Sequence, residues 1–350
     1  MTPTTQAPLA LPFAERKVRA AQPLEGLTAP RARALLAAAS IAALLLHGCA
    51  GTSHKIEKST LGVPRTTQDL LAVIDLPGPV ALETVNSADW AVPLGGLVNL
   101  DHPKAKAAGL VDKDEPIQIY FHALRHPEKG LFIVDTGVEK NLRDDRDHAA
   151  IRGMISGFMH FEKMKVNVPL GEWLAKAGAP LQGVFLTHLH VDHITGLADA
   201  PASAQVIGGP GEGSEHNFSN LLVQGNTDRA LEGKGPLGEW AFAPMAAKSV
   251  TPTGAAPLAF AGVLDIFGDG SVWALWVPGH TPGSTAYLVR TPTGPVLLTG
   301  DCSHTRWGWE NGVEPGSFTG DQQQNAVSLA LLRRLVAEHP KVEVRLGHQK

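Results

Sequence analysis

Four side chains of the types that bind metal ions lie within six residues, directly after a short apolar segment. They are His188, His190, Asp192 and His193, and they follow residues 183–187, whose pattern is typical of a buried strand. In an extended chain, residues two apart point to the same side, so His188 and His190 can face one ion. Asp192 and His193 come where the chain turns and can face a neighbouring ion. A hydrophobic core has no use for such a cluster, which therefore predicts a site for Zn, Mn, Fe or Co rather than a structural role.

Further histidines and aspartates take the same position, just past an apolar segment. They are His280 after 271–277, Asp301 after 296–299, His348 after 342–346 and Asp135 after 131–134. Metal and catalytic residues in α/β enzymes commonly lie on loops at one edge of a sheet. We therefore expect these residues to meet the 188–193 cluster at such an edge.

Apolar patterning predicts alternating strands and helices from residue 67 to residue 350, in one domain. Strands are expected at 117–124, 131–134, 183–187, 271–277, 285–290, 296–299 and 342–346, with a turn at 127–130. Helices are expected at 170–177 and 325–338, and Met154, Phe158 and Phe161 fall on one helical face. That apolar group is either an ordinary packed helix or, with Met159 and Met164, a lid over an acyl chain. The pattern gives no assignment for 208–260.

The first 66 residues differ from the rest. Two arginines precede a short apolar run, 34–46, which is followed by His47, Gly48 and Cys49. The run is too short to span a bilayer, which needs about 20 residues. A basic flank, an apolar run and then a cysteine resemble a bacterial lipoprotein signal, so 1–49 is interpreted as a signal segment and 50–66 as a polar linker. An exported protein, periplasmic or lipid-anchored at Cys49, is expected; the alternative is an alanine-rich helix of the mature chain.

Charge and cysteine content exclude several other classes. Lys and Arg number 30 against 34 Asp and Glu, a formal net charge of -4, which excludes a strongly basic nucleic-acid-binding protein. The two cysteines exclude a disulfide framework and a cysteine-rich zinc module. The expected partner is a small-molecule substrate.

The motifs occur in a characteristic order: His-x-His-x-Asp-His at 188–193, Pro-Gly-His-Thr-Pro-Gly-Ser at 278–284, Thr-Gly-Asp at 299–301 and a late Gly-His at 347–348. Over roughly 75–350 the chain resembles the metallo-β-lactamase-fold hydrolase superfamily. The resemblance implies an α/β fold, an αββα sandwich, with two divalent metal ions, zinc first and Mn, Co or Fe as alternatives. It also implies a set of ligands: His188, His190 and His280 for the first ion, Asp192, His193 and His348 for the second, Asp301 bridging both, and Asp135 orienting the ligands from behind.

Within the superfamily, the chain resembles the N-acyl-homoserine lactonase and organophosphate hydrolase branch. An aspartate at the bridging position, Asp301, differs from the true β-lactamases, and the stretch 309–318 is similar to the lactonases. Those lactonases carry a tyrosine three residues after the bridging aspartate, where this chain has His304. The resemblance implies that a metal-bridging hydroxide cleaves an ester, lactone or organophosphate. Asp192 or Asp301 would then pass a proton to the leaving group. His304 either contacts the substrate or is a surface histidine.

Two other functions compete with hydrolysis. A redox enzyme of the same fold, such as a persulfide dioxygenase, would use one iron and only the first ligand set. The presence of Asp192, His193 and His348 argues against it, because a mononuclear site does not need a second set. A non-catalytic, metal-stabilised binding protein is the third possibility.

Overall fold

The computed structural model describes residues 51–214, 218–243 and 257–349. The predicted signal segment and Cys49 lie outside the described residues. Among the helices of the described residues, none combines the length and apolar character needed to cross a membrane.

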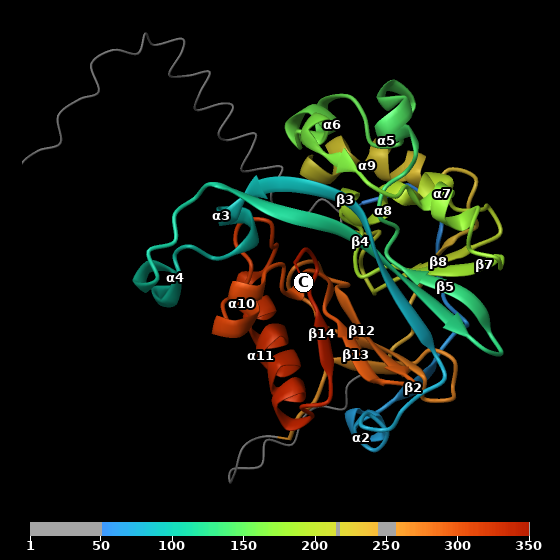
Figure 1. The fold of residues 1–350 in the computed structure, drawn as a ribbon, viewed down its shortest axis with the longest axis vertical. Coiled ribbons are helices and arrows are strands. Elements are labelled where there is room, and N and C mark those ends of the chain that lie inside the picture. The colour runs from blue at the N-terminus through green and yellow to red at the C-terminus, as the bar shows by residue number, and fades with distance from the viewer. Residues whose placement is uncertain (1–50, 215–217, 244–256, 350) are drawn as a thin grey trace, which may run out of the picture. The chain divides into compact units, whose positions relative to one another are not determined.

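Two β-sheets form the centre of the fold (Figure 1). The first sheet has the strand order β1 (Ile56–Lys58), β9 (Leu237–Glu239), β8 (Gln205–Gly208), β7 (Leu181–Phe185), β5 (Gly130–Val134), β4 (Asp114–His126), β3 (Ala81–Pro93) and β6 (Lys165–Val166). The second has the order β14 (Glu343–Arg345), β13 (Gly294–Leu298), β12 (Thr285–Thr291), β11 (Val272–Trp276), β10 (Gly262–Asp265) and β2 (Val63–Arg65). Strands β5, β7, β8, β9 and β1 run parallel, whereas β3, β4 and β5 are antiparallel neighbours.

Side chains that alternate along each strand fill the space between the sheets. In β5, Phe132 and Val134 point into the inter-sheet core, and Leu131 and Ile133 point to the opposite face. The ring of Phe185 in β7 stacks on Phe132 with a centroid distance of 5.2 Å. A strand that is buried on both faces has a continuous apolar sequence, which explains why 131–134 is recognisable without alternation.

Helices cover the outer faces of both sheets (Figure 1), which gives the αββα arrangement predicted from the sequence. Against the first sheet lie α7 (Leu170–Leu174), α8 (Val191–Ile194), the turn η3 (Thr195–Asp199) and α9 (Phe218–Ala230). Against the second lie α2 (Thr67–Leu71) and α11 (Gln322–Glu338). Helix α11 starts at Asp321, whose side chain accepts a hydrogen bond from the backbone N–H of Gln324 at 2.9 Å.

The remaining short helices lie around one end of the sandwich or at its surface. They are α3 (Leu94–Leu97), α4 (Pro103–Ala107), α5 (Asn141–Asp144), η1 (Arg146–His148), α6 (Met154–Phe158), η2 (Phe161–Lys163), η4 (Gly300–Cys302) and α10 (Arg306–Asn311). Residues of α3, α6 and η2 pack with the long β3–β4 hairpin into a separate hydrophobic cluster. This cluster matters for function because it adjoins the site described below.

The predicted strands and the helices at 170–177 and 325–338 are confirmed, but several other segments differ from prediction. The stretch 51–66, expected to be a polar linker, supplies the edge strands β1 and β2. Thr52 and Ser53 hold its start through hydrogen bonds to the carboxylate of Asp228. Edge strands depend on backbone pairing, which leaves little trace in side-chain polarity. Strand β3 was not predicted, since a bulge between Asn86 and Ala88 interrupts its alternation.

The single helical face predicted for Met154, Phe158 and Phe161 is wrong. Helix α6 ends at Phe158, and His160 adopts a left-handed backbone with φ of 54° before η2 begins. As a result Met154 is 66 % exposed while Phe161 is buried. The break turns the two residues to different surroundings.

Candidate metal centre

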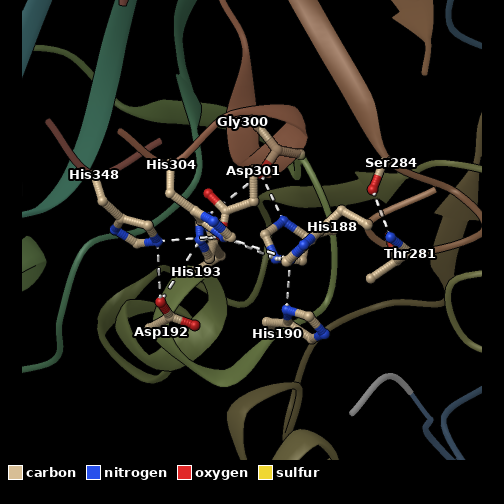
Figure 2. Close-up of polar contacts among 12 residues, drawn as sticks. His188, His190, Asp192, His193, Thr281, Ser284, Gly300, Asp301, His304 and His348 are labelled. Atoms are coloured by element: carbon tan, nitrogen blue, oxygen red, sulfur yellow. Dashed lines mark hydrogen bonds and ion pairs between the residues drawn. The ribbon is translucent and has the colours of Figure 1, made fainter. Parts of the chain in front are cut away.

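The ends of strands from both sheets deliver the predicted ligand residues to one place (Figure 2). His188 and His190 follow β7, and α8 then presents Asp192 and His193. From the second sheet come His280 after β11, Asp301 in η4 after β13, and His348 after β14. All seven predicted ligand residues meet, as expected for groups at the same edge of two packed sheets.

The first ligand group consists of His188, His190 and His280. Nε2 of His280 lies 3.1 Å from Nε2 of His188 and 2.9 Å from Nδ1 of His190. Three ring nitrogens that converge in this way can share one cation. Burial lowers the pKa of His188 and of His280 well below the usual value and that of His190 to about 4, so these rings offer lone pairs at neutral pH.

The second ligand group consists of Asp192, His193 and His348. Oδ2 of Asp192 lies 3.4 Å from Nε2 of His348 and 3.7 Å from Nε2 of His193. Asp301 lies between the two groups: its Oδ2 is 3.7 Å from Nε2 of His188, 3.3 Å from that of His193 and 3.1 Å from that of His348. This is the position that a bridging carboxylate requires.

The outer nitrogens of these rings are held by neighbouring groups. Nδ1 of His348 lies 3.0 Å from the carbonyl oxygen of Gln118, and Nδ1 of His193 lies 2.9 Å from Oδ2 of Asp135. Carbonyl and carboxylate oxygens only accept hydrogen bonds, so the rings donate there and turn the Nε2 lone pairs toward Asp301. Nδ1 of His280 lies 3.1 Å from Oγ1 of Thr319. Such partners fix the orientation of metal-binding histidines.

The donor set fits divalent cations. Nε2 of His193 and Oδ1 of Asp301 are buried without a hydrogen-bond partner. Burial alone would lower the pKa of His193, yet the carboxylates of Asp301 and Asp135 raise it well above its usual value. Burial likewise opposes ionisation of Asp301, but the rings of His348 and His193 hold its pKa well below the usual range. Imidazole lone pairs that face a buried carboxylate need positive charge between them, and a divalent cation supplies it.

Asp135 lies behind His193, as expected. Its carboxylate accepts hydrogen bonds from the backbone N–H of Thr187 at 2.8 Å and from the Thr187 hydroxyl at 2.9 Å, besides facing His193. Its backbone is left-handed, with φ of 54°, which is uncommon for a residue with a side chain. The turn after β5 thus accepts local strain to place this carboxylate.

His304 is buried, so the alternative of a surface histidine is wrong. Its Nδ1 lies 3.1 Å from the carbonyl oxygen of Leu97, and its Nε2 lies 3.0 Å from Oδ2 of Asp301. It therefore has the same arrangement as the predicted ligand His348, with an outer nitrogen on a carbonyl and an inner nitrogen at the centre. With His280 and Asp301 it forms a further group that could hold an ion.

Sequence reasoning missed two polar residues at the site, Glu212 and Thr319. Glu212 is buried just after β8, in the stretch 208–260 that the pattern left unassigned. A lone glutamate after a Gly-Gly-Pro-Gly turn at the end of a strand was the available signal for Glu212. Thr319 had none, since it lies 39 residues from the histidine it contacts.

An apolar cavity of about 750 Å³, including its opening, ends at the ligand groups. His190, Asp192, His280, Asp301, His304 and His348 form its polar end. Trp90, Leu97, Ile117, Phe158, Met159 and Phe318 are among its apolar lining. Phe161 and Met164 belong to the buried cluster instead, so the predicted apolar group is divided between packing and cavity wall. An apolar lining with a few polar groups at one end is typical of small-molecule sites.

Residues 115–348 match the Metallo-beta-lactamase superfamily. The chain belongs to this superfamily. A similar curated protein, N-acyl homoserine lactonase AttM of Azorhizobium caulinodans, is 27 % identical over 241 residues, which cover 67 % of this chain and 83 % of that protein. The predicted resemblance to this branch of the superfamily is thereby confirmed.

Solved structures support the same fold. AiiA of B. thuringiensis, with N-decanoyl-L-homoserine bound at its active site, superposes with a TM-score of 0.54 at 18 % identity, over 78 % of this chain and 94 % of that one. AidC, a dizinc quorum-quenching lactonase, superposes with a TM-score of 0.51 at 16 % identity, over 83 % of this chain and 92 % of that one.

Proposed function

We propose that the protein is a dinuclear metal-dependent hydrolase that cleaves an ester, lactone or organophosphate bond in a small apolar substrate. The observation that carries this proposal is the position of two ligand groups, joined by Asp301, at the polar end of an apolar cavity. The similarity to N-acyl homoserine lactonases favours an acyl ester or lactone among these substrates.

His188, His190 and His280 would hold the first ion, Asp192, His193 and His348 the second, and Asp301 both. When bound, the two ions supply a water molecule of lowered pKa and an electrophile for the substrate's carbonyl or phosphoryl oxygen. Zinc is our first choice, and Mn, Co or Fe suit the same ligands.

The protein's own residues would orient the substrate and move the proton. Asp192 lines the cavity, and its side chain is 12 % exposed against 4 % for Asp301. We therefore favour Asp192 over Asp301 as the group that passes a proton to the leaving group. His304 would contact the reacting oxygen of the substrate from the cavity wall, while Leu97 and Phe318 hold the apolar part. The apolar wall also limits access of water to the reacting bond.

Metal content and hydrolysis measured on the same sample test the proposal. We expect about two Zn, Mn or Co ions per purified chain by plasma mass spectrometry. Chelator-sensitive turnover is expected on one of three probes: an N-acyl homoserine lactone, an aryl ester or an organophosphate. His190→Ala should abolish turnover, whereas His148→Ala, a change at an exposed histidine, should leave it intact. One iron per chain without hydrolysis would refute the proposal and favour the redox alternative. Turnover that survives His190→Ala would also refute it.

A further inference from the structure

Glu212 joins the two chain segments that carry the first ligand group. Its Oε2 accepts a hydrogen bond from the backbone N–H of Leu189 at 2.8 Å, and Leu189 lies between His188 and His190. Its Oε1 accepts hydrogen bonds from the backbone N–H of Gly283 at 2.9 Å and from the hydroxyl of Thr281, the residue after His280. One carboxylate therefore connects the β7 end of the site to the β11 end.

The surroundings of Glu212 are closely packed. Glu212 itself is buried. A side chain at Gly283 would place its Cβ 2.6 Å from Cγ of Glu212, and one at Gly209 would place it 1.7 Å from the carbonyl oxygen of Gly283. The backbone N–H of Thr281 also donates a hydrogen bond to the hydroxyl of Ser284 at 2.9 Å (Figure 2). The two hydroxyl oxygens are 2.8 Å apart. The separation of the two segments is thus fixed by direct contacts.

A carboxylate suits this position better than an amide. At least three donors point at its two oxygens, and a buried carboxylate is tolerated when hydrogen bonds surround it. Glutamine would present one acceptor and one donor, so its amide nitrogen would face a backbone N–H of Leu189 or Gly283. The replacement therefore separates the two segments without removing side-chain volume.

We propose that Glu212 is a positioning residue that sets the metal affinity of the first ligand group. By holding Leu189 and Thr281 on one side chain, it fixes the distance between the His188–His190 pair and His280. The second group is held differently, by Asp135 behind His193 and by Gln118 behind His348. The inference rests on the metal pair of the proposed function and is independent of the substrate.

Cobalt binding by Glu212→Gln tests the proposal, because Co(II) reports its ligands by visible absorption whereas zinc is silent. Residues that orient metal ligands typically change affinity about 10- to 100-fold when replaced. We expect the first of two Co(II) sites to weaken by at least about tenfold while the second changes less than about twofold. After dialysis, plasma mass spectrometry should find about two ions in the wild type and about one in the variant.

Asp265→Asn is the matched control. Asp265 is also a buried carboxylate that accepts two backbone N–H bonds, from Gly268 at 2.9 Å and Gly270 at 2.8 Å, but it is the last residue of β10 and belongs to neither ligand group. Both variants should melt at lower temperature when metal-free, and only Glu212→Gln should lose one Co(II) site selectively.

Two results would overturn the proposal: unchanged affinity of both sites in Glu212→Gln, or equal weakening of both sites. If Glu212→Gln does not fold, Thr281→Val removes one of the donors to Glu212 at nearly constant volume, and unchanged first-site affinity there overturns the proposal equally. The readout is metal binding. A wild type that binds two ions and hydrolyses nothing therefore refutes the proposed function alone.

Discussion

Removing divalent metal should lower the melting temperature of this protein by roughly 13 °C, and the value follows from the two ligand groups. A ligand present at about a thousand times its Kd stabilises the folded state by about 4 kcal/mol, so two occupied groups contribute about 8 kcal/mol. A domain of about 300 residues unfolds with an entropy of about 0.6 kcal/mol per kelvin, from an average of about 2 cal/mol per kelvin per residue. Dividing the lost stabilisation by the entropy of unfolding gives the expected fall in melting temperature, about 13 °C. The buried Nε2 of His193 and Oδ1 of Asp301 have no hydrogen-bond partner among the described residues and would therefore be stabilised by a bound metal.

The measurement is thermal unfolding, followed by circular dichroism, in buffers that set the free zinc concentration. His190→Ala removes one ligand of the first group and keeps the second, so its shift should be about half that of the wild type. His148→Ala removes an exposed ring, and its melting temperature should respond to free zinc as that of the wild type does. A wild-type melting temperature that does not respond to free zinc would refute the reasoning. An undiminished response in His190→Ala would refute the assignment of that residue.

Three further predictions concern pH, the C-terminus and the cavity. Burial lowers the pKa of His122 to about 3 and that of His190 to about 4, below the usual 6.5. Between these values the unfolded chain therefore binds more protons than the folded one. The free energy of unfolding of the metal-free protein, measured with denaturant, should fall by roughly 1 kcal/mol per histidine for each pH unit from 6.5 down to 4. A free energy of unfolding that stays constant over this range would contradict the prediction. Deleting residues 346–350 should abolish second-site metal binding and reduce turnover over tenfold with unchanged far-ultraviolet circular dichroism, and full activity would exclude His348 as a ligand. Phe158→Ala should lower kcat/KM about fivefold for long-chain acyl substrates and little for short ones, since about 1 kcal/mol of apolar contact is lost; equal effects on both would place the acyl chain elsewhere.

The ligand residues could be predicted from the sequence because each sits just past a recognisable strand. Strands β7 and β13 end in buried apolar residues, so their ends are easy to locate, and His188 and Asp301 lie three residues further on. Strand β3 could not be located, because its bulge between Asn86 and Ala88 shifts the alternation halfway along.

Glu212 shows a different limit of sequence reasoning. Its partners are mainly backbone N–H groups, which every residue except proline has, so no residue type marks them in advance. The break after α6 has a similar cause, since it depends on the left-handed backbone of His160 rather than on a glycine or proline. The position of Glu212 thus depends on contacts between distant segments, whereas the hydrogen bonds of His160 to Gly157 and Glu162 are local.

The outer contacts of the ligands come from five different parts of the chain. Asp135 follows β5, Gln118 lies in β4, Glu212 follows β8, Leu97 ends α3 and Thr319 precedes α11. Four of these contact predicted ligands or the segments that carry them, whereas Leu97 lines the cavity and holds His304 with its carbonyl oxygen. Because that hydrogen bond uses the backbone, the side chain at position 97 can change the shape of the cavity without releasing His304. Substrate preference can therefore vary in α3 and α6 while the geometry of the ligand groups, fixed by the two sheets, stays the same.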